Sequence, residues 1–155
     1  MTGATREPSA TIGRRKFVEC LSLAAAAIAV SGCASLVTHA VTPVDNAIRL
    51  RIDQYPDLTK PGGALRIQPA GQPDPLYVLR GADANGTATF TTLSSRCTHR
   101  GCTVDVNGVN LVCPCHGSTY ARGGTVLRGP AEIPLRSFPT VVGADGTIVI
   151  RLEGP

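Results

Sequence analysis

The sequence predicts an all-β protein of stacked antiparallel sheets, with a small subdomain inserted between two strands. Three observations favour this fold class. No segment from residue 47 onward shows a helical period of apolar residues. The 155 residues include 17 Gly and 12 Pro, a composition that is typical of short strands and turns. Several short runs alternate or are β-branched, and the chain length suits one domain.

The expected strands follow one another between residues 47 and 152. The first, Ala47–Tyr55, alternates apolar and polar residues from Ile48, as a half-buried strand does. The others are expected at Ala64–Gln68, Leu76–Arg80, Thr87–Leu93, Ser137–Val142 and Thr147–Leu152. Turn signals separate them at Pro61-Gly62-Gly63, Asn85-Gly86 and Asp145-Gly146, and the last of these predicts a hairpin.

Residues 1–33 are expected to be an export signal rather than part of the fold. Arg14 and Arg15 precede the apolar run Leu21–Val30, which gives a basic region followed by a short apolar one. The paired arginines, followed by Phe17, resemble a twin-arginine signal. The chain is therefore expected to leave the cytoplasm.

Three outcomes stay open for the end of this segment. The run Val30-Ser31-Gly32-Cys33 resembles a bacterial lipobox, in which Cys33 would carry a lipid. The mostly apolar residues Cys20–Val37 would otherwise remain as a membrane anchor, although their alanines make them weakly hydrophobic. Either outcome tethers the domain to the outer, periplasmic face of the cytoplasmic membrane. Release into the periplasm is the third.

Residues 34–46 are predicted to be a linker, and the folded domain is expected to cover residues 47–155. Pro43 discourages a helix through the linker, and His39 is expected to be solvated there. From residue 34 onward eleven Lys or Arg residues face nine Asp or Glu residues, so this part is close to neutral. It has no basic stripe that would indicate nucleic-acid binding.

Two short segments carry the residues that could bind a metal: CTHRGC at 97–102 and CPCHGS at 113–118. Thiolates and imidazoles together suit iron–sulfur clusters or zinc. Two cysteines on one iron and two histidines on the other are the ligand set of a Rieske [2Fe–2S] centre. A structural zinc ion would use the same four residues but would leave Cys102 and Cys115 without a role. The cluster is therefore favoured, and the chain is expected to carry electrons.

The residues between these segments predict how the two come together. Val104–Val112 is expected to form a hairpin with its turn at Asn107-Gly108, which would fold the first segment back against the second. Residues 94–132 are thus the expected inserted, cluster-binding subdomain.

From Cys97 to Ala131 the chain resembles the Rieske iron–sulfur proteins, in particular the high-potential type of cytochrome bc complexes. The resemblance implies one [2Fe–2S] cluster as the cofactor. It implies that the cluster ligands are Cys97 and Cys113 on the buried iron and His99 and His116 on the outer iron, and that Cys102 and Cys115 form a disulfide. Gly129-Pro130-Ala131 resembles the proline loop that shields the cluster in this family.

Two hydroxyl groups follow the second segment. The resemblance implies that Ser118 donates a hydrogen bond to a bridging sulfide and that Tyr120 donates one to the sulfur of Cys97. Such bonds stabilise the reduced state and raise the reduction potential, as does replacing two thiolates by neutral imidazoles. Reduction is expected to be coupled to proton uptake at the histidine ligands, and His116 is the expected contact for quinol.

The resemblance implies an electron-transfer subunit of a quinol-oxidising complex, not catalytic alone, with cytochrome b, a c-type cytochrome and quinol as partners. Three residues depart from the family pattern. Arg100 stands where the family usually has an apolar residue at the docking tip, and a charge is costly to bury in an apolar pocket. Ala121 and Glu132 stand where an acidic residue and a proline are common. None of the three is a ligand, so they bear on the partner and not on the cluster.

Two other roles stay open. A tethered Rieske subunit or carrier for another exported oxidoreductase, of the arsenite-oxidase type, accommodates Arg100 better because a polar tip suits a transient protein surface. A ferredoxin component of an oxygenase system fits less well, because such ferredoxins are cytoplasmic and generally lack the disulfide and the two hydroxyls. Once His99 and His116 are used, only His39 remains, so the chain alone is not an oxygenase with a two-histidine iron site.

Overall fold

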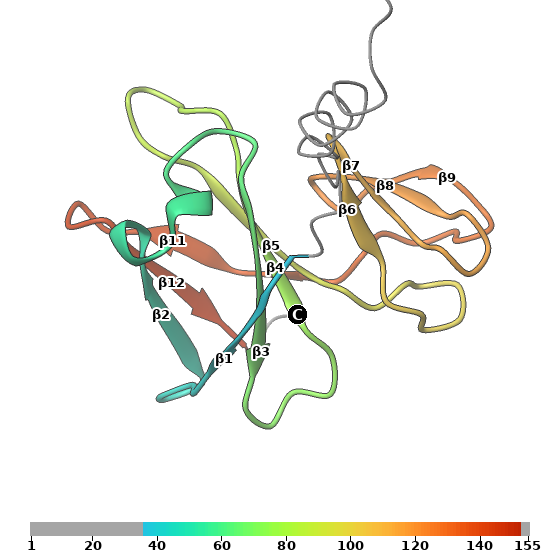
Figure 1. Cartoon of the computed structure of the whole chain (residues 1–155), viewed down its shortest axis with the longest axis horizontal. Coiled ribbons are helices and arrows are strands. Elements are labelled where there is room, and N and C mark those ends of the chain that lie inside the picture. Colours follow the sequence, from blue (N-terminus) through green and yellow to red (C-terminus); the bar gives the residue numbers. More distant parts are fainter. Residues whose placement is uncertain (1–35, 153–155) are drawn as a thin grey trace, which may run out of the picture. The chain divides into compact units, whose positions relative to one another are not determined.

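The computed structural model describes residues 36–152, which contain twelve β-strands and two single-turn 3-10 helices (Figure 1). The expected twin-arginine signal and Cys33 lie outside the described residues, as does most of the apolar run. Within residues 36–152 no helix combines the length and apolar character needed to cross a membrane. The prediction of an all-β fold is confirmed for this part of the chain.

The largest sheet has five strands in the order β1-β3-β4-β5-β10. Its strands are β1 Thr38–Val41, β3 Ala64–Pro69, β4 Leu76–Arg80, β5 Phe90–Ser94 and β10 Ser137–Phe138. Neighbouring strands are antiparallel except for β1, which pairs in parallel with β3. Every residue of β4 is buried, because apolar cores cover both faces of this sheet.

A three-stranded antiparallel sheet in the order β11-β12-β2 packs on one of these faces. Its strands are β2 Ala47–Arg51, β11 Thr140–Val142 and β12 Thr147–Arg151. The expected single strand Ser137–Val142 is in fact two strands that belong to different sheets. Pro139 separates them, and because proline has no N–H for a ladder, the chain changes sheets at this residue.

The domain begins earlier in the chain than the sequence predicts. The linker prediction for residues 34–46 is wrong at Thr38–Val41, which form the edge strand β1. His39 is half-buried, and its ring centroid lies 5.4 Å from that of Tyr55, so His39 is not a solvated linker residue. The four residues of this strand, THAV, carry no clear apolar alternation, so only their pairing with β3 identifies them as a strand.

The first predicted strand, Ala47–Tyr55, is shorter than expected. It ends at Arg51, and Ile52–Gln54 and Pro56–Leu58 form the 3-10 turns η1 and η2. Pro56 has no N–H to donate to a strand ladder. The turn that it begins places Leu58 fully inside the core between the five-stranded and the three-stranded sheet.

Four short strands in the order β6-β7-β8-β9 form the inserted subdomain (Figure 1). They are β6 Asp105–Asn107, β7 Asn110–Val112, β8 Thr119–Ala121 and β9 Val126–Arg128. The predicted hairpin is present, but its turn lies one residue later, because Asn107 pairs with Asn110 and leaves Gly108-Val109 as the loop. Gly108 has a φ of 57°, which the first loop position of a type II′ turn requires.

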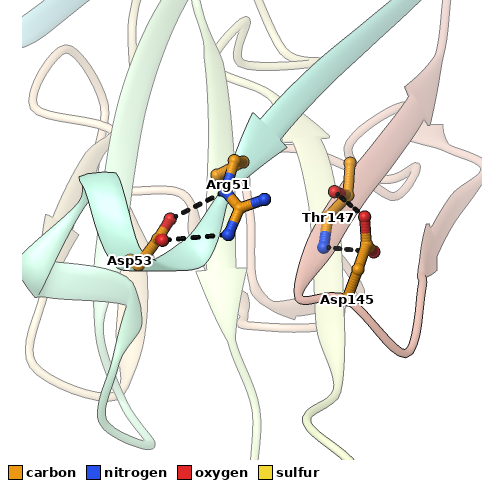
Figure 2. A network of polar contacts seen from close by, with 4 residues as sticks. All are labelled: Arg51, Asp53, Asp145 and Thr147. Carbon is orange, nitrogen blue, oxygen red and sulfur yellow. Dashed lines mark hydrogen bonds and ion pairs between the residues drawn. The ribbon is translucent and has the colours of Figure 1, made fainter.

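The predicted Asp145-Gly146 hairpin joins β11 to β12, and a side chain reinforces it. The Asp145 carboxylate accepts hydrogen bonds from the backbone N–H and the Oγ1 of Thr147, at 3.0 and 2.8 Å (Figure 2). These bonds lower the pKa of Asp145 from its ordinary value.

Nearby, Arg51 donates two hydrogen bonds to Asp53 at 3.1 and 3.0 Å (Figure 2), and they lower the pKa of that carboxyl group.

A second core joins the inserted subdomain to the other face of the large sheet. Its members include Tyr77, Leu79 and Leu93 from the large sheet and Val104, Leu111 and Tyr120 from the subdomain. The hydroxyl of Tyr77, a residue that is 1% exposed, donates a 2.8 Å hydrogen bond to the carbonyl of Val104. Burial raises the pKa of Tyr77, so the hydroxyl stays a donor. This bond holds Val104, two residues after the first segment of predicted ligands, against β4.

Replacing Tyr77 with Phe should lower the free energy of unfolding by about 1–3 kcal/mol, because the buried carbonyl of Val104 would lose its side-chain donor. Urea unfolding of the metal-loaded full chain, followed by circular dichroism, measures this change. Tyr55→Phe is the matched control, since Tyr55 is only half-buried and donates no comparable bond within residues 36–152. Equal losses in the two variants would contradict the role given to the Val104 bond.

Candidate metal centre

Two loops of the inserted subdomain carry the predicted ligands, and each is closed by the same pair of backbone bonds. In the first loop, Cys97 donates to the carbonyl of Cys102 and Gly101 donates to the carbonyl of Cys97, both at 2.8 Å. In the second, Cys113 donates to Ser118 at 2.8 Å and Gly117 donates to Cys113 at 3.0 Å. Both glycines have a φ of 78°, in the left-handed region that favours glycine. Each loop therefore holds its first cysteine and its histidine in a fixed relation.

A disulfide joins the two loops. The structure links Cys102 to Cys115, which is the pairing that the family resemblance implied. The sulfurs of this pair lie within 4.8 Å of the Cys113 sulfur, so the disulfide packs directly beside the second ligand cysteine. The bridge leaves Cys97 and Cys113 as the free cysteines of the described chain.

The structure brings the predicted ligands together in pairs: the two cysteines share the second core, and the two histidines contact each other. Cys97 and Cys113 are 2% and 1% exposed, and each of the two thiols shifts the pKa of the other. The rings of His99 and His116 lie edge to face with their centroids 4.8 Å apart. His116 is exposed to solvent, whereas His99 is half-buried. The third histidine, His39, is not part of this site and contacts Tyr55 instead.

The donor set fits a metal centre. The Nδ1 atom of His99 is buried and has no hydrogen-bond partner among the described residues. A buried polar atom without a partner is costly, and coordination of a metal would satisfy it. Two buried thiols and two imidazoles also match the donors that iron–sulfur centres use.

The two ligand cysteines have different acidities. Burial alone would raise the pKa of Cys97, but hydrogen bonds from Tyr120 and from the backbone N–H groups of His99 and Arg100 together lower it. Burial and the neighbouring Cys97 raise the pKa of Cys113. The hydrogen bonds at Cys97 therefore outweigh the effect of burial, and those at Cys113 do not.

Tyr120 lies at the centre of a hydroxyl network. Its oxygen is 3.3 Å from the sulfur of Cys97 and 3.0 Å from the Oγ1 of Thr98, and it accepts a 3.2 Å bond from the N–H of Thr98. Thr98 gives its own hydroxyl proton to the carbonyl of Ile133 at 2.7 Å. Because the Thr98 proton is used in this way, Tyr120 donates its own proton to the Thr98 oxygen, and in the contact with Cys97 either the thiol or the Tyr120 hydroxyl can be the donor.

Ser118 is fully buried on the other side of the site. Its hydroxyl oxygen accepts a 3.0 Å bond from the backbone N–H of Ala131, which leaves its proton available to an acceptor. The predicted proline loop at Gly129-Pro130-Ala131 is thus tied to the second ligand loop, and Thr98 ties the neighbouring Ile133 to the first. Thr98 was not predictable from the sequence, because its only signal was its position next to Cys97.

Comparisons with known proteins assign the chain to a family. The family model of the Rieske [2Fe–2S] domain matches residues 51–139. The cytochrome b6-f complex iron-sulfur subunit of Synechococcus sp. (strain JA-2-3B'a(2-13)) is 42% identical over 84 residues, which are 53% of this chain and 47% of that protein. The cytochrome b6-f complex iron-sulfur subunit 1, chloroplastic, of Nicotiana tabacum is 37% identical over 79 residues, which are 50% of this chain and 34% of that protein. The chain thus spans about half the length, or less, of these curated relatives.

Two solved structures are similar to this chain. The cyanobacterial plasma membrane Rieske protein PetC3 from Synechocystis PCC 6803 is 30% identical, with a TM-score of 0.49, over 57% of this chain and 86% of that one. The quaternary ammonium Rieske monooxygenase CntA is 18% identical, with a TM-score of 0.50, over 63% of this chain and 29% of that one. The second likeness concerns the fold alone.

The range matched by the family model is more than half of the chain and includes both ligand loops. The fold, the disulfide and the paired cysteines and histidines agree with that match. The chain therefore belongs to the Rieske [2Fe–2S] domain family and is an electron-transfer protein whose cofactor is one [2Fe–2S] cluster.

Proposed function

We propose that Cys97 and Cys113 bind one iron of the cluster through their sulfurs and that His99 and His116 bind the other through ring nitrogens. The burial of the two thiols and the unpartnered Nδ1 of His99 support this assignment. When bound, the cluster supplies one-electron transfer. The chain's own residues exclude water from the two sulfurs, hold the two loops together and place hydroxyl donors beside them.

We further propose that the protein is the iron–sulfur subunit of a quinol-oxidising cytochrome bc-type complex and passes electrons to a c-type cytochrome. The observation that carries this proposal is the placement of two buried hydroxyls, Ser118 and Tyr120, against the ligand loops. Donors at sulfur favour the reduced state and so raise the potential into the range that a quinol can reduce. The likeness to cytochrome b6-f subunits supports the same role.

In this proposal His116 is the quinol contact. It is exposed on the second ligand loop, where a quinol hydroxyl can approach its ring. Cytochrome b would supply the apolar pocket for the quinol, and the proposed ligand role fixes the orientation of the ring. The exposed ring of His116 is also the natural exit for an electron toward a c-type cytochrome.

Arg100 favours a second candidate function. It is exposed on the first ligand loop, where a charge is suited to a polar protein surface rather than an apolar pocket. A tethered subunit or carrier for another exported oxidoreductase, of the arsenite-oxidase type, would present such a surface. A ferredoxin component of an oxygenase system has no observation of its own in its favour.

We propose that the domain is exported by the twin-arginine route and tethered outside the cytoplasmic membrane. Arg14, Arg15 and the apolar run after them support export, and the lipobox-like residues before Cys33 support lipidation. An uncleaved apolar anchor is the alternative tether.

The intact mass of the mature protein, purified from membranes of its own host, tests this proposal. Lipidation should give the mass of residues 33–155 plus a lipid, and Cys33→Ala should abolish that species. Uncleaved chains in both variants, differing in mass only by the sulfur atom that the substitution removes, would contradict lipidation and favour the anchor.

The reduction potential tests the proposed complex. A redox titration of the full chain, monitored by electron paramagnetic resonance, should give a Rieske signal with a potential near the positive end of the family range, about −150 to +300 mV. Chemical analysis should find iron and acid-labile sulfide in equal amounts. A potential near the negative end would rule out quinol oxidation, and zinc without labile sulfide would overturn the ligand assignment.

The hydroxyl donors should each contribute to that potential. Tyr120→Phe and Ser118→Ala should each lower it by about 40 mV, the shift that corresponds to a 1 kcal/mol preference for the reduced state. The spectrum should still report an assembled cluster. Tyr55→Phe and Ser137→Ala are matched controls, because both residues lie outside the site, and their potentials should match that of the unmodified chain. An unchanged potential in Tyr120→Phe would remove its assigned role.

A further inference from the structure

A cavity of about 530 Å³ opens beside the first ligand loop. Residues 97–101 form one wall, residues 72–74 form a second, and the chain around Ile133 and Arg136 forms a third. Three arginines line it, and among the described residues Asp74 is the one carboxylate that does so. The local charge is therefore positive directly beside the metal centre, in a domain that is otherwise close to neutral.

The fold holds one of these guanidinium groups against the first ligand loop. A nitrogen of Arg96 lies 3.6 Å from the carboxylate of Asp74. On its other side the guanidinium packs on Gly101, where a Cβ atom would lie only 3.1–3.4 Å from three of its atoms. The φ of 78° at Gly101 also disfavours a side chain there. The contacts with Asp74 and Gly101 thus fix the position of the Arg96 guanidinium, although the side chain is 60% exposed.

The other two arginines complete a basic rim around an apolar residue. The guanidinium of Arg136 lies 4.8 Å from the centre of the Phe138 ring, within the range of a cation–π contact. Arg100 is exposed next to His99. Ile133 is 62% exposed at the cavity, and its backbone is held by the bond from Thr98. Arginine together with an exposed apolar side chain is the composition of a protein-binding surface rather than of a small-anion site.

We propose that this face, formed by Arg96, Arg100, Arg136 and Ile133, is the docking surface for an acidic region of a redox protein. The proposal rests on the proposed transfer of electrons to a protein partner, which both candidate functions share. Three cations against one partly paired carboxylate favour a partner of negative charge. Electrostatic complementarity would steer association and bring the partner's redox centre close to His99, on a transient interface of modest area.

The test uses the full, cluster-loaded chain and two soluble redox proteins of opposite charge: an acidic plastocyanin and a basic c-type cytochrome. In stopped-flow oxidation, one electron leaves the reduced chain and converts Cu(II) of plastocyanin to Cu(I). The triple variant Arg96→Gln, Arg100→Gln, Arg136→Gln should react with plastocyanin about tenfold more slowly at low salt. The difference should vanish near 1 M salt, where charges are screened within about 3 Å.

Binding provides a readout that does not depend on electron transfer. The dissociation constant for Cu(I) plastocyanin at low salt should rise with the same substitutions, and the rate with the basic cytochrome should not fall. The matched control removes three exposed cations elsewhere, by Arg49→Gln, Lys60→Gln and Arg151→Gln, and should leave the plastocyanin values close to those of the unmodified chain. The reduction potential of each variant separates a change in driving force from a change in docking.

Several outcomes would overturn the docking surface. These are equal plastocyanin rates and affinities for the triple variant and the unmodified chain, equal losses in the control variant, or an equal fall with both probes. Loss of retention on anionic lipid vesicles, with unchanged plastocyanin binding, would assign the arginines to a membrane surface instead. None of these measurements uses quinol, so a low potential that sinks the bc-type proposal would leave this test intact.

Discussion

The metal centre depends on one constraint, which is that two loops from different parts of the chain must present their ligands at the same point. The β6–β7 hairpin turns the chain back between the two loops, so that they can meet. The Cys102–Cys115 disulfide then joins the two loops covalently. The two cysteines are 13 residues apart, and closing a ring of this size raises the free energy of the unfolded chain by about 3 kcal/mol, because it removes conformational entropy. Within each loop, the internal backbone hydrogen bonds fix the position of the histidine relative to the first cysteine.

Tyr120 gives the centre an asymmetry that the ligand pattern alone does not contain. The two free cysteines have the same chemistry and nearly the same burial, yet the pKa of one thiol is lowered and that of the other is raised. Part of the difference follows from the Tyr120 hydroxyl beside Cys97, and part from the two thiols, which shift each other in opposite directions. Thr98 anchors that hydroxyl from the loop side and also binds Ile133. One buried side chain on β8 thereby contacts the first ligand loop at Cys97 and Thr98, and Thr98 itself links that loop to the segment that follows the proline loop.

The sequence could predict what local chemistry determines. The strand Leu76–Arg80 has the expected bounds, and the Asn85-Gly86 turn has both residues at positive φ, because apolar runs and turn residues carry their own signal. The strand β1, the change of sheet at Pro139 and the position of Arg96 were not predictable. Each depends on a partner distant in sequence: β3 for the edge strand, the second sheet for residues 140–142, and Asp74 for the arginine. Thr98 is similar, since its role depends on Ile133, 35 residues later.

The two ligand loops present different surfaces, and this difference limits how a partner can approach. The second loop exposes His116 and Pro114, whereas the first exposes Arg100. An unpaired guanidinium buried in an apolar pocket costs several kcal/mol, but the same group at the wet rim of an interface costs little and steers encounter. A quinol pocket could therefore receive the second loop only if Arg100 stays at its rim, opposite polar or acidic groups. The charge on the first loop is compatible with a cytochrome bc-type partner whose rim is acidic, and it disfavours one that encloses both loops in apolar surface.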